Sequence, residues 1–129
     1  MKLVLDTNAY CRCDVGDASA LEALEDARQL FLPSIVYGEL YFGFKHGNHF
    51  EKNLKRLDEF LDRFQVDVIP MDLDVAKKFG EIYSHLRKKR KPIPTNDIWI
   101  SACCMEVGGT LLTADRHFES VDQIQVHYL

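Results

Sequence analysis

The sequence lacks any long apolar run. None of its hydrophobic stretches approaches the roughly 20 residues that a membrane-spanning helix needs. The apolar opening, Met1 to Leu5, is also shorter than the core of a secretory signal peptide. We therefore expect a protein that is neither inserted into a membrane nor exported, and that works in the cytoplasm.

Cysteine is scarce, and its spacing does not suit zinc. The four cysteines form two tight pairs, Cys11 with Cys13 and Cys103 with Cys104. Neither pair has the two-residue spacing common in zinc sites, and no histidine has a matching spacing. We expect the thiols to be reduced and mostly structural.

A general excess of basic residues is also missing, since the formal net charge is -4. This argues against a protein that coats nucleic acid, because affinity for phosphate backbones comes largely from Lys and Arg. One basic run stands out shortly before Asp97, and it consists of Arg87, Lys88, Lys89, Arg90 and Lys91. Such a run is either a solvated helix end or a guide for RNA phosphates, and both interpretations stay open.

What is present is the composition of one globular domain. The chain has 129 residues, of which 47% are hydrophobic and 28% charged, and this length is enough for a single packed core. No linker, repeat or low-complexity stretch divides it. We therefore expect a single domain over residues 1–129.

Short apolar runs alternate with segments of helical periodicity. After a polar loop through Asp17, apolar residues recur at intervals of three and four, and Ser34, Asn48, Asp72 and Thr95 or Asn96 are candidate helix caps. Gly47 and the Gly108-Gly109 pair are candidate stop signals. The expected strands are 3–5, 30–32, 66–69, 110–113 and 125–128, and the expected helices are 21–28, 34–44, 50–64, 75–86 and 97–107. This alternation predicts an α/β fold with a central parallel sheet of four to five strands and helices on both faces.

Four acidic residues stand where such a fold would bring them together. Asp6 and Asp115 follow apolar strands, Asp97 begins a helical pattern, and Glu39 lies inside an apolar helical stretch. Ligands collect at the C-terminal edge of a parallel sheet, and an unpaired carboxylate is costly to bury. The four acids therefore predict a divalent-metal site.

A site built from carboxylates favours Mg²⁺, with Mn²⁺ as a possible substitute, over zinc. Near a phosphodiester, such ions polarise the phosphoryl oxygen and activate water. Without metal the carboxylates repel one another, so at least one should take up a proton more readily than a free side chain. Each acid also has a purely structural interpretation: Asp6 as a strand-end cap, Asp97 as a first-turn residue that complements the helix dipole, and Asp115 as a turn former.

Four segments together resemble a known family. They occur in family-like order and spacing, and they are Leu5–Asn8, Pro33–Leu40, Pro94–Ala102 and Leu112–Phe118. Over its whole length the chain resembles the PIN-domain nucleases, most closely the short VapC-type toxins of VapBC toxin–antitoxin pairs. It departs from the family in its unbroken basic run up to Pro92, where related sequences often have a glycine.

The resemblance implies a Mg²⁺- or Mn²⁺-dependent endoribonuclease with an acidic metal-binding and catalytic quartet. Its residues would be Asp6, Glu39, Asp97 and Asp115, supported by Asn8 and Thr113. The resemblance also implies a cognate antitoxin whose arginine-bearing tail blocks the acidic site, and we expect a homodimer. Two alternatives remain open, a housekeeping PIN nuclease without an antitoxin and a non-catalytic RNA-binding PIN module. The intact quartet argues against the second.

Other side chains near these motifs allow more than one interpretation. His117 follows Asp115 by two positions and can reach a phosphate or metal, although the family pattern uses this stretch mainly to shape the loop. Tyr37, Tyr41 and Phe44 recur on one face of the Glu39 helix. By default they belong to the core, and by resemblance they could line a groove for an antitoxin tail.

Overall fold

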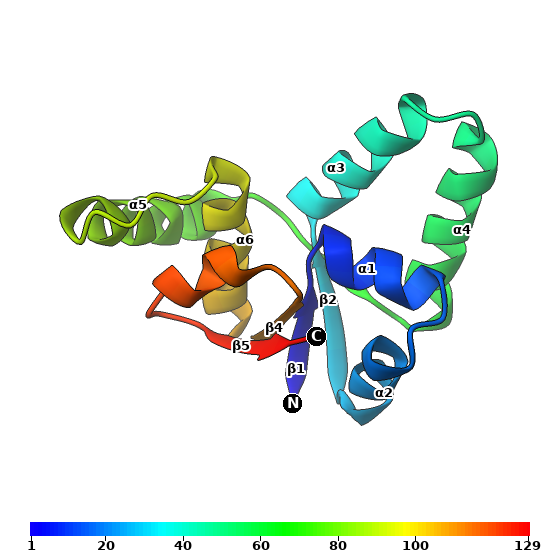
Figure 1. The fold of residues 1–129 in the computed structure, drawn as a ribbon, viewed down its shortest axis with the longest axis horizontal. Coiled ribbons are helices and arrows are strands. Elements are labelled where there is room, and N and C mark those ends of the chain that lie inside the picture. The colour runs from blue at the N-terminus through cyan, green and yellow to red at the C-terminus, as the bar shows by residue number, and fades with distance from the viewer.

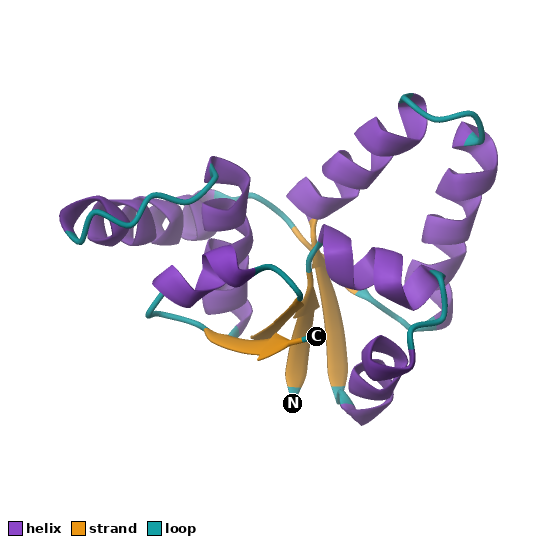
Figure 2. Ribbon diagram, viewed as in Figure 1, coloured by secondary structure: helices purple, strands orange, loops and turns teal.

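A five-stranded, all-parallel sheet lies at the centre of the computed structural model, which describes residues 1–129 (Figures 1 and 2). The strand order is β3-β2-β1-β4-β5. The strands are β1 (Lys2–Leu5), β2 (Gln29–Pro33), β3 (Asp67–Ile69), β4 (Thr110–Thr113) and β5 (Gln125–Tyr128). The prediction of a parallel α/β sheet is confirmed, with five strands.

Helices cover both faces of this sheet, as predicted. Figure 1 shows α1 to α4 on one side and α5 and α6 on the other. The helices are α1 (Thr7–Asp14), α2 (Ala18–Asp26), α3 (Ser34–Lys45), α4 (Phe50–Arg63), α5 (Leu73–Lys88) and α6 (Thr95–Val107), followed by the 3₁₀ helix η1 (Arg116–Ser120). The longest of them, α5, has 16 residues, and no helix combines the length and apolar character needed to cross a membrane.

The centre of the sheet is the point where the direction of winding reverses. From β1 the chain moves outward through β2 and β3, and it then crosses to β4 on the other side of β1. Ligands of open α/β sheets bind at such a switch point, beyond the carboxyl ends of the strands. Here that place lies between the ends of β1 and β4.

Burial fixes the register of these two strands. Leu3, Val4 and Leu5 are at most 1% exposed, as expected for a central strand covered on both faces. Val4 is paired with Leu111 and Leu5 with Leu112. The next residues along, Asp6 and Thr113, are therefore brought level with each other.

The predicted polar loop through Asp17 is wrong for most of its length. Residues 7–14 form α1, because the Asp6 side chain caps the helix by accepting a hydrogen bond from the Ala9 backbone N–H. Ala9, Tyr10 and Cys13 then supply a small buried face. The polar residues between them hide this face in the sequence, and the 3₁₀ helix η1 was also not expected.

Most predicted helix ends are confirmed or lie within a few residues. Asp72 caps α5 as expected, and Gly108 ends α6 with the left-handed φ of 65° that glycine favours. The other three predicted caps are wrong. Pro33 and Pro94 occupy the N-cap positions of α3 and α6, one residue before the expected caps, and His49 rather than Asn48 precedes α4.

Candidate metal centre

The four predicted acids come from four different elements and lie at one edge of the sheet. Asp6 follows β1, Asp115 follows β4, Glu39 lies in α3 and Asp97 lies in the first turn of α6. Burial raises the pKa of Asp6 and of Asp97 most. The charges of Asp97 and Asp115 add to the shift at Asp6, and those of Asp115 and Glu39 add to the shift at Asp97. The tertiary structure therefore brings the four acids close enough for their charges to influence one another.

Asp6 is the most deeply buried of these carboxylates, at 5% exposure. One oxygen accepts a hydrogen bond from the Ala9 N–H at 2.8 Å, and the other accepts one from the Thr113 hydroxyl. These two bonds favour the charged form, but burial, together with the charges of Asp97 and Asp115, outweighs them and raises the pKa of Asp6 to about 6.

This pKa confirms the expectation that at least one acid binds a proton more readily than usual. The cause differs from the expected one, however. Burial contributes most to the shift at Asp6, and repulsion from the neighbouring acids contributes less. The position of Asp6 at the end of a fully buried strand explains this order.

Thr113 connects the ends of β1 and β4. It is fully buried, its hydroxyl donates to Asp6, and its oxygen accepts from the Asp115 backbone N–H at 2.9 Å. Asp115 in turn accepts a hydrogen bond from the His117 backbone N–H at 2.8 Å and so caps η1. One threonine thus fixes the relative positions of two acids, which agrees with its predicted supporting place.

Glu39 accepts hydrogen bonds from two residues that are sequence neighbours of Asp6 and Asp97. The Thr7 hydroxyl donates to its Oε1 at 3.3 Å, and the Asn96 side-chain amide donates to its Oε2 at 2.8 Å. Glu39 is only half-buried, so these bonds and water reduce the burial cost that the sequence suggested. The site contributions of Thr7 and Asn96 were missed, although each directly follows or precedes an acid of the quartet.

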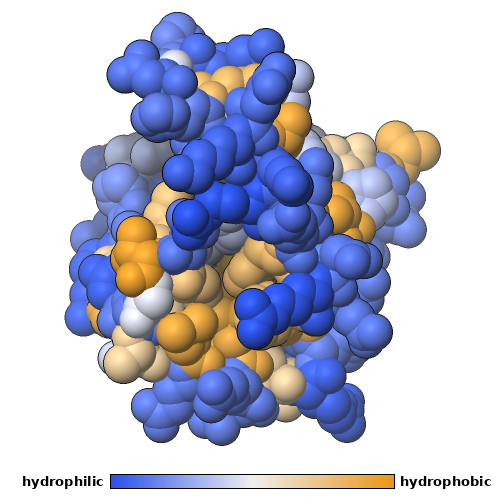
Figure 3. Space-filling model, turned by 90° about the vertical axis from the view of Figure 1, so that its right-hand side faces the viewer, coloured by the Kyte–Doolittle hydropathy of each residue, from blue (hydrophilic) through white to orange (hydrophobic).

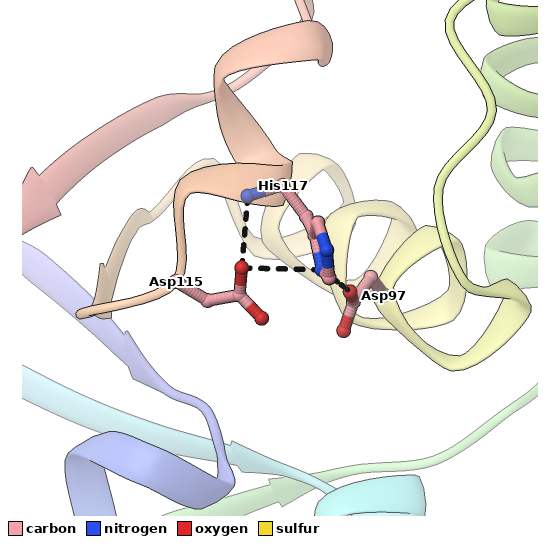
Figure 4. A group of neighbouring side chains, drawn as sticks. All are labelled: Asp97, Asp115 and His117. Carbon is pink, nitrogen blue, oxygen red and sulfur yellow. Dashed lines mark hydrogen bonds and ion pairs between the residues drawn. The ribbon is translucent and has the colours of Figure 1, made fainter.

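Asp97 and Asp115 face each other across the His117 ring (Figure 4). The ring Nδ1 lies 3.2 Å from Asp97 Oδ2 and 3.1 Å from Asp115 Oδ1. Burial raises the pKa of Asp97, while the His117 hydrogen bond opposes this shift. One ligand atom from each of the three residues lies within 4.8 Å of the others, a spacing compatible with a shared metal ion.

The donor set fits a hard divalent cation. Carboxylate oxygens predominate, and one imidazole joins them at the exposed side of the site. In addition to burial, the neighbouring acids raise the pKa of Asp6 and Asp97, and a metal ion would neutralise the excess negative charge that causes this effect. His117 therefore belongs to the candidate site, although its place two residues after Asp115 gave it little weight in the sequence.

Comparison with known proteins identifies the family of this chain. The PIN domain matches residues 3–124. The chain belongs to the PIN domain family. It is 33% identical to Ribonuclease VapC2 of Haemophilus influenzae over 127 residues, which cover 94% of this chain and 92% of that protein. It is 30% identical to Ribonuclease VapC2 of Rickettsia felis over 72% of this chain and 68% of that protein.

Solved structures share the whole PIN fold with this chain. VapBC2 from Rickettsia felis, bound to a promoter DNA fragment, superposes with a TM-score of 0.87 at 25% identity and covers 99% of this chain and 98% of that chain. DNA-bound VapBC from Salmonella typhimurium gives the same TM-score and identity, with coverages of 98% and 97%. The fold class and the resemblance found in the sequence are both confirmed.

The structural interpretations of the acids hold alongside the functional one. Asp6 is the N-cap of α1, Asp115 is the N-cap of η1, and Asp97 lies in the first turn of α6. A carboxylate oxygen retains a second lone pair after accepting one hydrogen bond, so capping leaves it free to bind a cation. In this PIN domain the caps orient the carboxylates toward one another.

The remaining predicted residues lie around the acids rather than among them. Asn8 is exposed in the first turn of α1 and takes no part in the hydrogen bonds that order the acids. The basic run occupies the end of α5 and the segment after it, with only Lys89 half-buried. Their roles stay predictions.

The raised pKa of Asp6 predicts a stability that depends on pH. A carboxyl that binds its proton more tightly when folded stabilises the fold at low pH, and this contribution is lost as pH rises from about 3.8 to about 6. Asp6→Asn removes the effect. In excess chelator, its stability relative to wild type should rise by up to about 3 kcal/mol between pH 3.5 and pH 7, measured by urea unfolding.

The matched control is Asp72→Asn, the same substitution at the exposed N-cap of α5. For each variant, the difference in unfolding free energy from wild type is followed against pH. If this difference changes with pH no more for Asp6→Asn than for Asp72→Asn, the prediction is contradicted.

Proposed function

We propose that this PIN domain protein is an endoribonuclease that hydrolyses RNA with Mg²⁺ or Mn²⁺ and acts as the toxin of a VapBC-type pair. The observation that carries the proposal is the convergence of Asp6, Glu39, Asp97 and Asp115 at the switch point of the sheet. The identity to ribonucleases named VapC over nearly the whole chain supports the reaction.

In this proposal Asp97 and Asp115 hold the metal most directly, with Asp6 and Glu39 completing the acidic shell. A bound Mg²⁺ or Mn²⁺ would supply Lewis-acid activation of the phosphodiester and of water. The chain's own hydrogen bonds keep the acids in place. Thr113 and the Ala9 N–H orient Asp6, while Thr7 and Asn96 orient Glu39.

The proposed partner is an antitoxin whose arginine reaches the acids. An Arg guanidinium can bond carboxylates bidentately, so it would compete with the metal for the same oxygens. A hollow of about 520 Å³ adjoins Glu39 and is lined by Thr7, Ile35, Gly38, Glu39 and Phe42. Ile35 and Phe42 in this hollow could contact apolar residues of the antitoxin that flank its arginine.

The side chains expected to line this groove need correction. Tyr37 is half-buried and donates to Asp58 on α4, and Phe44 packs against the core. Tyr41 is 39% exposed and contacts Phe50. Phe42, at 65% exposure, is the large apolar residue beside Glu39.

The outer side of α3 and α4 has the mixed character of a contact surface. It is mostly hydrophilic, with apolar side chains gathered around a central hollow (Figure 3). An RNA substrate and an antitoxin made in the same cell would place the protein in the cytoplasm. The expected homodimer stays a prediction.

Replacing one acid should separate metal binding from folding. Asp97→Asn removes an anionic ligand without changing the shape of the side chain, so Mn²⁺ affinity measured by calorimetry should fall at least tenfold and RNA cleavage should be lost. The circular dichroism spectrum should be unchanged. Asp74→Asn, an exposed first-turn acid of α5, is the matched control. Full cleavage by wild type in excess chelator would contradict metal dependence.

Expression of the chain alone should arrest cell growth, and coexpression of its antitoxin should restore growth. Phe42→Ser removes the apolar contact beside Glu39 while leaving the acids intact. It should keep the toxicity but weaken rescue, because the antitoxin loses about 2 kcal/mol of apolar burial. Val15→Ser, at an exposed apolar residue after α1, is the control. Normal growth with abundant wild-type chain would favour a housekeeping PIN nuclease instead.

A further inference from the structure

The five basic residues after Tyr83 do not form one patch. Lys88 and Lys89 line a hollow on one side of α5, together with Glu81 and His85. Lys89 is already paired there, since its Nζ lies 3.0 Å from Asp122 Oδ2. The acidic groups on this side make it a poor place for a phosphate.

The two arginines lie on a different side. Arg87 and Arg90 line a groove of about 350 Å³ between the end of α5 and the segment that leads into α6. Neither guanidinium lies within 4.0 Å of a carboxylate, unlike Lys89. In Figure 1 this segment runs back along α5 to the start of α6.

The rest of the groove is apolar and contains one aromatic ring. Tyr83 is 42% exposed, and its ring packs edge-on against Phe79, which fixes its orientation. Pro92 and Ile93 supply the facing surface. An aromatic face beside free arginines matches the chemistry of a nucleotide, because the ring stacks a base and the guanidiniums contact phosphates.

One residue of the groove is next to an acid of the quartet in the sequence. Its inner wall is Ile98, which directly follows Asp97 in the first turn of α6. Successive residues of a helix point about 100° apart, so Asp97 and Ile98 point to different sides of the first turn of α6. The first turn of α6 therefore contributes to both the acidic site and the groove.

Arg90 keeps its position at a conformational cost. Its φ of 56° is left-handed, and its N–H and that of Lys91 bond to the carbonyls of Arg87 and Leu86, the arrangement in which glycine is usual. Replacing Arg90 by glycine would therefore remove the guanidinium without straining the turn.

We propose that this groove is a nucleotide-binding subsite for the RNA substrate, in which Arg87 and Arg90 contact the RNA backbone and Tyr83 stacks a base. The proposal rests on the proposed ribonuclease function. It assigns RNA contact to two of the five basic residues.

The test compares Arg87→Ser and Arg90→Gly with wild type in two assays. Binding of a short labelled single-stranded RNA is measured by anisotropy in excess chelator at several salt concentrations, and cleavage of the same RNA is measured with Mg²⁺. Each variant should bind about tenfold more weakly and lose about 0.7 from the slope of log affinity against log salt. KM should rise while kcat stays within about twofold.

Backbone controls separate binding from folding. Arg90→Gly relieves the left-handed conformation, so its urea midpoint should be equal to or above that of wild type. Gln65 is the other residue besides glycine with a left-handed backbone, with a φ of 51°. Gln65→Gly should relieve the same backbone strain there and leave RNA binding unchanged. Lys77→Ala removes an exposed cation from α5 outside the groove and should also have no effect. Tyr83→Phe should retain affinity that Tyr83→Ala loses.

The possible failures are distinct. If the wild-type chain cleaves RNA and both arginine variants have the same KM and salt slope as wild type, the proposed subsite is wrong and the ribonuclease function is unaffected. A wild-type chain that neither binds nor cleaves RNA would overturn both. Arginine variants with normal RNA kinetics but weakened antitoxin binding would assign the groove to the protein partner and overturn the RNA subsite.

Discussion

The hydrogen bond from Thr113 to Asp6 is the contact on which the site depends. It joins the ends of β1 and β4, the two strands on either side of the point where the winding of the sheet reverses. The pairing of Leu5 with Leu112 brings the two residues level, and the apolar burial of both strands fixes that pairing. A slip of one residue would move Asp6 out of line with Thr113, so the pairing of the strands sets the geometry of the acids.

Helix caps extend this order to the rest of the site. Asp6 and Asp115 begin α1 and η1, so the same carboxylates that repel one another also satisfy backbone N–H groups. Glu39 is fixed through Thr7 and Asn96, which belong to the helices that start beside it. The charge of the site is thus stabilised locally by hydrogen bonds. Burial raises the pKa of Asp6, and a cation bound nearby would stabilise its charged form.

The surroundings of the PIN domain centre divide into surfaces of different chemistry. An apolar hollow beside Glu39 exposes Phe42, whereas the groove beside Ile98 combines Tyr83 with two free guanidiniums. The first suits the apolar residues of a protein tail, and the second suits the backbone and bases of RNA. The first surface includes Glu39 itself, and the second is linked to the acids through Ile98, which follows Asp97 in α6.

The sequence by itself determined the α/β class and most of the order of strands and helices, and it predicted the four acids, because apolar periodicity and motif spacing are local properties of the chain. It did not reveal α1, whose buried face is only a few residues long and depends on the cap at Asp6. Only the tertiary structure decided that Thr7, Asn96 and His117 surround the acids, and that Arg87 and Arg90 face away from Lys88 and Lys89. These relations join elements far apart in the chain or depend on the rotation of a helix end, and neither leaves a local pattern.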